Sequence, residues 1–197
     1  MKEIFQILRR RWKLTVSLLF GLFIFSVGVG VSGAYVLAYT STEEFCTGCH
    51  EMTYNLAEYK GTIHDTNRTG VRAICTNCHV PHEPGPLVWA KIKASKDVFY
   101  TYISPSIDTP AKFEAKRATM AHRVWKDMIE SDSHQCRSCH RADKMSVDLQ
   151  SEKAQKRHAK AKEDGKTCIE CHFGIAHHEP EGPGPSELFG KAAAKTN

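Results

Sequence analysis

Eight cysteines in this chain of 197 residues fall into four copies of one short pattern, and each copy ends in a histidine. The copies are Cys46–His50, Cys75–His79, Cys136–His140 and Cys168–His172, with second cysteines at Cys49, Cys78, Cys139 and Cys171. This Cys-x-x-Cys-His pattern is the attachment signature of c-type haem. The two thiols add to the vinyl groups of the haem, and the adjacent histidine is held beneath the iron as an axial ligand. The sequence therefore predicts four covalent haems per chain and electron transfer.

Three other uses of cysteine compete with this interpretation. Eight cysteines are enough for four disulfides in a secreted domain. Paired Cys-x-x-Cys units can also form zinc sites with four thiolate ligands, and a single unit can act as a thiol-redox pair. None of these uses requires a histidine directly after every second cysteine, so haem attachment is favoured.

The histidines outside the four motifs are candidates for the second axial ligand of each iron. His64 lies between the first and second motifs, and His158 lies at the matching place between the third and fourth. This correspondence predicts that both are distal ligands. His177 follows the fourth motif by a short loop and is a third candidate, with its neighbour His178 as a rival. His82 lies very close to its own motif, and we expect surface or haem-propionate contacts for His122 and His134.

The first motif differs from the others because Met52 follows His50 by two residues. A thioether at this position can reach the iron and change the reduction potential of the haem. The alternative is a buried methionine that packs on the haem without binding the iron, a common role for this flexible side chain. The first haem is therefore predicted to have either Met52 or His50 as its effective ligand.

A long apolar segment precedes the four motifs, and residues 14–39 contain no charged side chain. At about 1.5 Å of rise per residue this segment spans the roughly 30 Å hydrocarbon core of a bilayer. A cleaved signal peptide has a shorter apolar region of about 7–15 residues, so we expect a retained anchor. The basic run Arg9–Arg11 predicts a cytoplasmic N-terminus, with everything after about Thr40 in the periplasm. Small residues near one face of this helix permit close contact with another helix, so a homo-oligomer is an alternative to a monomer; they are Ser26, Gly30 and Gly33.

The net charge of +5 does not indicate nucleic-acid binding. The excess of cations lies in the flank of the membrane anchor, and the remaining chain is nearly neutral. We therefore expect the lipid bilayer, not nucleic acid, as the partner of the basic N-terminus.

The chain is predicted to be mainly α, with one transmembrane helix and a small multihaem domain of short helices and loops. Helical patterns at residues 87–103 and from Thr109 onwards, where Pro110 occupies the first turn, separate two similar dihaem units. A domain this small has a modest side-chain core, so the haems must supply much of the buried apolar area. The predicted boundaries are residues 1–13 cytoplasmic, 14–39 membrane anchor, 40–178 periplasmic tetrahaem domain with halves 43–105 and 106–178, and 179–197 a disordered tail rich in Pro and Gly.

Several longer strings extend the similarity beyond the four motifs: EEFCTGCHEM, NRTGVRA, CHVPHE, KIKASKD, DTPAKFEAKRATMA and TCIECHFGIAH. With them the chain resembles the NapC/NirT family of tetrahaem quinol dehydrogenases over nearly its whole length, and most of all the NapC branch. The resemblance implies electron transfer from ubiquinol or menaquinol to a periplasmic reductase complex, with nitrate reductase as the expected partner. It also implies that Met52 serves the first haem, and that His64, His158 and His177 serve the other three.

The family's quinol site falls in the KIKASKD segment, where the resemblance implies roles for Lys91 and Asp97. Lys93 and Lys96 are close enough in sequence to be rivals of Lys91. Lys91 and Asp97 are six residues apart, so on a helix they lie roughly 120° apart around the axis. Two other functions compete with quinol oxidation: a multihaem reductase that acts directly on a small substrate such as nitrite, and a passive tethered electron carrier.

Overall fold

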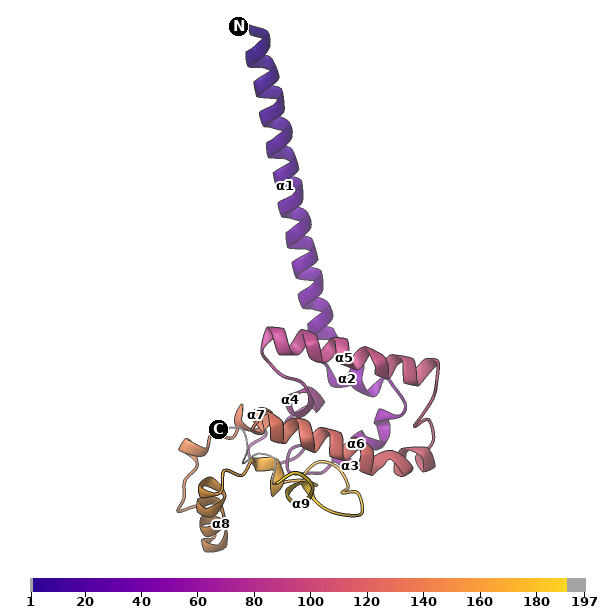
Figure 1. Cartoon of the computed structure of the whole chain (residues 1–197), viewed down its shortest axis with the longest axis vertical. Coiled ribbons are helices and arrows are strands. Elements are labelled where there is room, and N and C mark those ends of the chain that lie inside the picture. The colour runs from indigo at the N-terminus through magenta and orange to yellow at the C-terminus, as the bar shows by residue number, and fades with distance from the viewer. Residues whose placement is uncertain (1, 191–197) are drawn as a thin grey trace. The chain divides into compact units, whose positions relative to one another are not determined.

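The computed structural model describes residues 2–190, and side-chain burial from residue 9 onwards. This range contains helices and loops but no strand, which confirms the predicted mainly α class. It divides at Ser41 into an N-terminal helix and one compact unit that begins at Thr42 (Figure 1). The elements are α1 (Lys2–Tyr39), α2 (Glu43–Thr47), α3 (Met52–Tyr59), α4 (Cys75–His79), α5 (Pro84–Tyr102), α6 (Pro110–Glu130), α7 (His134–Arg137), η1 (Ala142–Lys144), α8 (Glu152–Glu163), η2 (Cys168–Glu170) and α9 (Pro185–Phe189).

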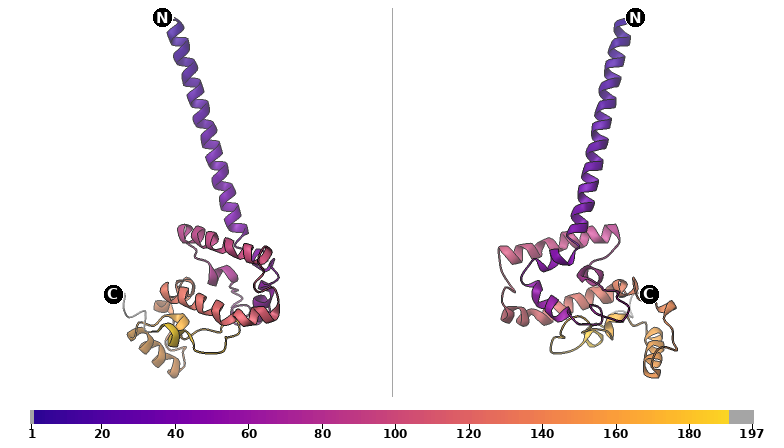
Figure 2. Two further views of the ribbon diagram at one scale, coloured as in Figure 1. Left: turned by 45° about the vertical axis from the view of Figure 1, so that its right-hand side comes forward. Right: turned by 180° about the vertical axis from the view of Figure 1, so that it is seen from behind.

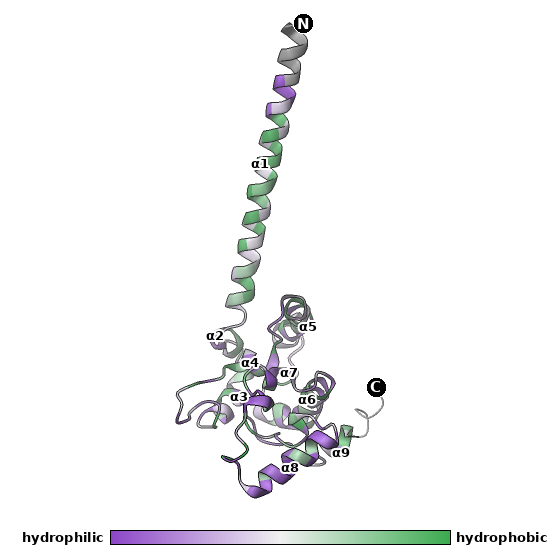
Figure 3. Cartoon of the chain, turned by 90° about the vertical axis from the view of Figure 1, so that its left-hand side faces the viewer, coloured by the Kyte–Doolittle hydropathy of each residue, from purple (hydrophilic) through white to green (hydrophobic). Residues whose placement is uncertain are grey.

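Helix α1 is long and apolar enough, over Arg9–Tyr39, to cross a membrane. Figure 3 shows a polar stretch near its start, followed by apolar residues as far as its end. Large side chains such as Leu18, Phe20 and Phe25 are exposed along it. In water such exposure is unfavourable, and a lipid environment removes the penalty. The apolar N-terminal helix predicted from the sequence is therefore present.

A retained anchor makes a direct prediction about the mature protein. N-terminal sequencing should find a chain that begins at or near Met1, because the apolar segment is too long for a signal peptide. Intact mass measurement after membrane extraction provides an independent check. A mature chain that begins near Thr40 would show that the helix is a cleaved leader.

The two long helices α5 and α6 cross the second unit at two levels (Figures 1 and 2), and α2, α3 and α4 lie to one side of them (Figure 3). Helix α6 begins as the sequence predicts: the Thr109 hydroxyl accepts a hydrogen bond from the backbone N–H of Lys112 at 3.3 Å, and Pro110 occupies the first turn. Helix α5 begins at Pro84, three residues before the predicted start. A proline is tolerated there because the first turn of a helix does not need its N–H.

The side-chain core of this unit is small. Trp125, Met128 and Ile129 of α6 pack against Ile169 of η2. All of α5 is described, and no residue in it is buried; Trp89 on this helix is 61% exposed. Such limited burial agrees with the prediction that haems supply apolar area between the helices.

The predicted tail contains a short helix that the sequence does not predict. The chain after Glu179 is not disordered throughout, because α9 contacts α6 and η2, with Pro185 fully buried and Phe189 packed against the core. Proline is suited to the first turn of a helix, and the aromatic ring of Phe189 supplies the apolar contact that holds this short helix. Residues 191–197 of the predicted tail lie outside the described residues.

Candidate functional site

Three of the four motif histidines lie next to a histidine from elsewhere in the chain. The ring centroids are 6.0 Å apart for His140 and His64, 6.1 Å for His79 and His177, and 5.9 Å for His172 and His158. Each pair combines one motif histidine with one of the three predicted distal ligands. The pairs therefore bring together six of the predicted ligand residues.

These separations fit one iron between each pair of imidazoles. A bond between a metal and an imidazole nitrogen is about 2 Å long, so two rings on opposite sides of one iron have centroids roughly 6 Å apart. The Nδ1 atoms of His64 and His177 are buried and have no hydrogen-bond partner among the described residues. The paired residues are thus a suitable set for a bis-histidine haem iron.

At three of these histidines the surroundings favour the neutral imidazole, which is the form that binds a metal. Burial, and then the nearby His140, lower the pKa of His64. Burial also lowers the pKa of His177. Solvent reaches His79, but the protein that surrounds its ring, together with His177, lowers its pKa to about 4.

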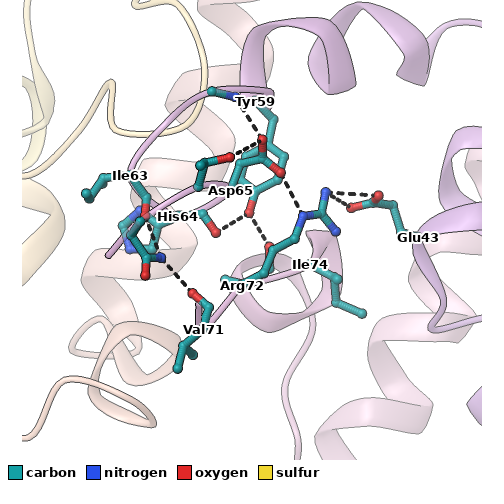
Figure 4. Close-up of polar contacts among 12 residues, drawn as sticks. Glu43, Tyr59, Ile63, His64, Asp65, Val71, Arg72 and Ile74 are labelled. Carbon is teal, nitrogen blue, oxygen red and sulfur yellow. Dashed lines mark hydrogen bonds and ion pairs between the residues drawn. The ribbon is translucent and has the colours of Figure 1, made fainter. Parts of the chain in front are cut away.

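A compact polar network fixes the loop that contains His64 (Figure 4). The Tyr59 hydroxyl donates to the carbonyl oxygen of His64 at 2.6 Å and also contacts the carbonyl oxygen of Ala73. Asp65 accepts a hydrogen bond from the Arg72 Nε at 2.7 Å, and Arg72 also donates to Glu43 of α2 at 3.1 Å. The loop is therefore tied both to the end of α3 and to the first motif.

The first motif has a different arrangement. His50 Nε2 donates to the backbone carbonyl of Asp108 at 3.2 Å, and its Nδ1 lies 3.4 Å from the Glu51 carboxylate. The His50 side chain is 61% exposed, whereas Met52 begins α3 and is partly buried. The Nε2 of His50, the atom that binds iron in a c-type haem, thus already has a protein partner. Met52 as the ligand of the first haem stays a prediction.

Successive motifs are neighbours in space. The thiols of Cys46 and Cys75 lie within hydrogen-bonding distance, and this contact lowers the pKa of Cys46 and raises that of Cys75. Burial, and then the nearby Cys139, raise the pKa of Cys78, which joins the second motif to the third. The third and fourth motifs meet in the same way: burial and then Cys168 raise the pKa of Cys136. The attachment points thus follow one another in the order of the sequence, as a chain of electron carriers requires.

The two predicted quinol-site residues occupy different surroundings on α5. Lys91 is partly buried, and burial lowers its pKa, while the neighbouring Cys46 of the first motif opposes this shift. Lys93 and Lys96 are exposed. The protein around the Asp97 carboxyl group raises its pKa, and Lys96 and Arg123 of α6 partly oppose this effect. Lys91 therefore lies near the first motif, and Asp97 faces charges from another side, as their helical separation predicts.

A family model described as the NapC/NirT cytochrome c family, N-terminal region, matches residues 8–182. This chain belongs to the NapC/NirT cytochrome c family. Membership implies covalently bound haem c, which the histidine pairs fit, and a role in electron transfer. Together with α1 it supports a single-pass protein of the inner membrane.

Several curated members of the NapC/NirT family are similar to this chain. The denitrification system component NirT of Stutzerimonas stutzeri is 53% identical over 144 residues, which cover 73% of this chain and 71% of NirT. The cytochrome c-type protein NapC of Escherichia coli K12 is 49% identical over 142 residues, covering 72% and 70%. The cytochrome c-type protein TorY of Escherichia coli O157:H7 is 46% identical over 173 residues, or 87% of this chain; this chain spans about half the length of TorY. No solved structure matches this chain.

In this NapC/NirT-family chain, some supporting residues were not identified from the sequence. His158 Nδ1 donates to the Gln150 side-chain oxygen at 2.7 Å, which leaves Nε2 free for a metal. Glu58 accepts a hydrogen bond from the backbone N–H of His178 at 2.9 Å, while Arg117 donates to the same carboxylate at 2.5 Å. These contacts direct His178 outwards and leave His177 beside His79. Single glutamine, glutamate and arginine residues have no spacing pattern, so the sequence offers no signal for them.

The remaining histidines have partners of other kinds. His134 Nε2 contacts the Glu83 carboxylate at 2.6 Å. The His122 ring packs 5.4 Å from that of Trp125, and its Nε2 is buried without a hydrogen-bond partner among the described residues. His82 is exposed. The predicted surface position thus fits His134 well, while His122 is partly buried.

The haem stoichiometry of this NapC/NirT-family protein can be counted. A pyridine haemochrome assay with intact mass should give four haems per chain, because four complete motifs are present. The double variant C46S/C49S removes both thiols of the first motif and should give three. A mass equal to two haems in the unaltered protein, or bound zinc in their place, would contradict the prediction.

Proposed function

We propose that this protein oxidises membrane quinol and passes the electrons, one at a time, through four haems to a periplasmic reductase complex, nitrate reductase in our assignment. One observation supports this most directly: three motif histidines each face a second imidazole at the spacing of a single iron. An iron with two strong protein ligands has no open position for a substrate, so such sites favour electron transfer over chemistry on a small molecule. When bound, the haems accept and pass single electrons.

The same pairs support an assignment of the axial ligands. We assign His64 with His140, His177 with His79, and His158 with His172, and we assign Met52 to the first motif. The Gln150 side chain holds His158 in the tautomer that presents Nε2. His50 stays with the Asp108 carbonyl. This assignment gives three similar sites and one different site, and the different one follows closest after α1 in the sequence.

Quinol oxidation releases two protons together with two electrons, so the site needs a base as well as an electron acceptor. We assign the base to Asp97. Its raised pKa is closer to neutral pH than that of an ordinary aspartate, and a general base is most effective when its pKa lies near the operating pH. Lys91, which lies near the first motif, donates a hydrogen bond to a quinol oxygen. Exposed Trp89, Phe99 and Tyr102 suit α5 to the membrane interface, where quinol enters from the lipid.

The proposed orientation places the N-terminus in the cytoplasm and the unit from Thr42 in the periplasm, since basic residues flank the start of the apolar segment. The relatives named for the NapC and NirT systems support a periplasmic reductase as the electron acceptor. Nitrate reductase is the partner that we propose among them. A homo-oligomer formed through the small residues of α1 stays a prediction.

The test of this function is reduction of the purified, detergent-held protein by ubiquinol and menaquinol analogues, followed through the haem absorption bands. We expect at least one analogue to reduce the haems without an added electron carrier. Reduction by dithionite but by neither quinol would instead indicate a passive carrier. Turnover of nitrite by the isolated protein with an artificial donor would indicate a direct reductase.

A further inference from the structure

Helix α8 has an outer face that is strongly basic. Its sequence, EKAQKRHAKAKE, contains five basic residues and two acidic ones. At about 100° per residue, Lys153, Lys156, Arg157 and Lys160 lie within an arc of roughly 100°, on the side of the helix away from His158. All four are exposed. Within the described part of the chain, only Lys160 among them has an ion-pair partner, Asp164 at 3.3 Å.

The inner face of the same helix has a different composition. Ala154, Gln155 and Ala161 are partly buried, and His158 on this side faces His172 at 5.9 Å. Lys162 also lies on this side of the helix and is exposed. The other four basic side chains project from the opposite side and are not arranged around the His158–His172 pair, so their charge is available to a partner outside the molecule. Figure 3 shows α8 as a largely hydrophilic helix.

An exposed apolar loop, residues 145–150, precedes the start of α8. Leu149 is 88% exposed and Val147 is 57% exposed, just before α8 begins. The loop is fixed to the helix, because the Gln155 side chain donates to the carbonyl oxygens of Val147 and Gln150, both at 3.0 Å. Gln150 in turn contacts His158 at 2.7 Å. The loop is thus fixed near the start of the helix, and it contains one exposed acid, Asp148. A fixed apolar group near charged residues is a common composition of a protein-binding surface.

We propose that the outer face of α8, together with the loop 145–150, is the docking surface for an acidic electron-acceptor protein. This proposal rests on the proposed function, since it makes the fourth motif the exit for electrons. A helix with its side chains is about 10–12 Å across, so a partner on the outer face lies about one helix diameter from the His158–His172 pair. Four clustered cations attract an acidic partner and increase its association rate. The exposed Leu149 then supplies apolar contact.

The composition of the face favours a protein over a lipid surface. A helix that lies on a membrane combines basic residues with a large apolar face of Trp, Phe and Leu residues. In α8, which is described along its whole length, the residues opposite the basic face are alanine, glutamine, histidine and Lys162, and none of them is a large apolar residue. Apolar contact comes instead from the neighbouring loop, where two exposed side chains are too few to bury a helix in lipid.

The test uses full-length, dithionite-reduced protein mixed in a stopped-flow cell with a high-potential acidic monohaem cytochrome. The variant K153E/K156E should lower the second-order oxidation rate about tenfold at low ionic strength, and high salt should remove most of the difference. The control K116E/K126E makes the same charge change at exposed positions of α6 and should alter the rate less than twofold. Leu149→Ser should slow the reaction at both salt concentrations. A basic cytochrome of similar potential should react faster with K153E/K156E than with the unaltered protein.

An equal decrease of the oxidation rate in K153E/K156E and K116E/K126E would show that the effect depends only on net charge, and would overturn the proposal. So would an unaltered rate in K153E/K156E. Hydrogen exchange of α8 in nanodiscs tests the lipid alternative: protection that requires anionic lipid, with an unchanged acceptor rate in the variant, would also overturn it. Dithionite replaces quinol as the donor, so these results do not depend on quinol oxidation. A failure of quinol to reduce the haems would count against the proposed function alone.

Discussion

Replacing Asp97 with asparagine is expected to abolish the reduction of the haems by quinol, while dithionite still reduces all of them. Asparagine keeps the shape of the side chain but cannot accept the proton that quinol releases. Loss of a general base typically lowers a rate about 10²–10⁴-fold. The measurement is the initial rate of haem reduction by a quinol analogue in detergent. Asp127→Asn, at an exposed position of α6, is the matched control and should keep the normal rate.

The same carboxylate predicts a pH dependence. Only the ionised form of Asp97 can accept a proton, so the rate should fall as the pH drops through its pKa. The protein around Asp97 raises this pKa above its ordinary value, which moves the decrease in rate to a higher pH than for an ordinary aspartate. The residual rate of Asp97→Asn should not show this decrease at low pH. Lys91→Gln should weaken the binding of a quinol-site inhibitor, and normal quinol oxidation in both variants would locate the site elsewhere.

Replacing His64 with alanine is expected to convert one low-spin haem to a high-spin haem. The iron assigned to the third motif would keep only His140, and a five-coordinate iron with one imidazole is high-spin. The electron paramagnetic resonance spectrum of the oxidised protein should lose one low-spin signal and gain a high-spin signal near g = 6, which accounts for about one haem in four. The other low-spin signals should stay.

A matched control exists one residue from another proposed ligand. His178→Ala removes an exposed imidazole that contacts Glu58 and faces no motif histidine, so its spectrum should equal that of the unaltered protein. His158→Ala should behave like His64→Ala, but with loss of a different low-spin signal. An unchanged spectrum in His64→Ala would show that the pairing with His140 is wrong.

The sequence was sufficient to identify the residues of the haem motifs and the candidate distal histidines, but not to predict which motif histidine each distal histidine faces. Cys-x-x-Cys-His is a local pattern, and the spacing of His64 and His158 marks both as candidates. Their matching positions suggest equivalent roles, yet in the structure His158 faces the following motif, whereas His64 faces His140 of the other half. Whether His64 faces His140 or His79, which is closer along the chain, depends on how the loop after Tyr59 folds back. That fold is a tertiary feature. Local spacing contains no information about it.

The same reason explains the errors at the ends of elements. Thr109 and Pro110 are strong local signals, and α6 begins where they predict. The residues of α9 follow a stretch rich in Pro and Gly, which indicates disorder when read alone. Their order comes from Phe189 and Pro185 meeting α6 and η2, which are distant in sequence. The ligand geometry of the first motif likewise depends on Asp108, which is far from His50 along the chain.

The small core of the unit from Thr42 has a consequence for how the cell produces this protein. With so few buried apolar side chains, the polypeptide before haem attachment has little free energy to oppose its conformational entropy. A ligand that binds only the folded chain shifts the folding equilibrium towards it, and a covalent ligand makes that shift permanent. Haem attachment then acts as a folding checkpoint, and chains that miss a haem stay open to proteases. The amount of mature protein would therefore follow the supply of haem as well as the rate of synthesis.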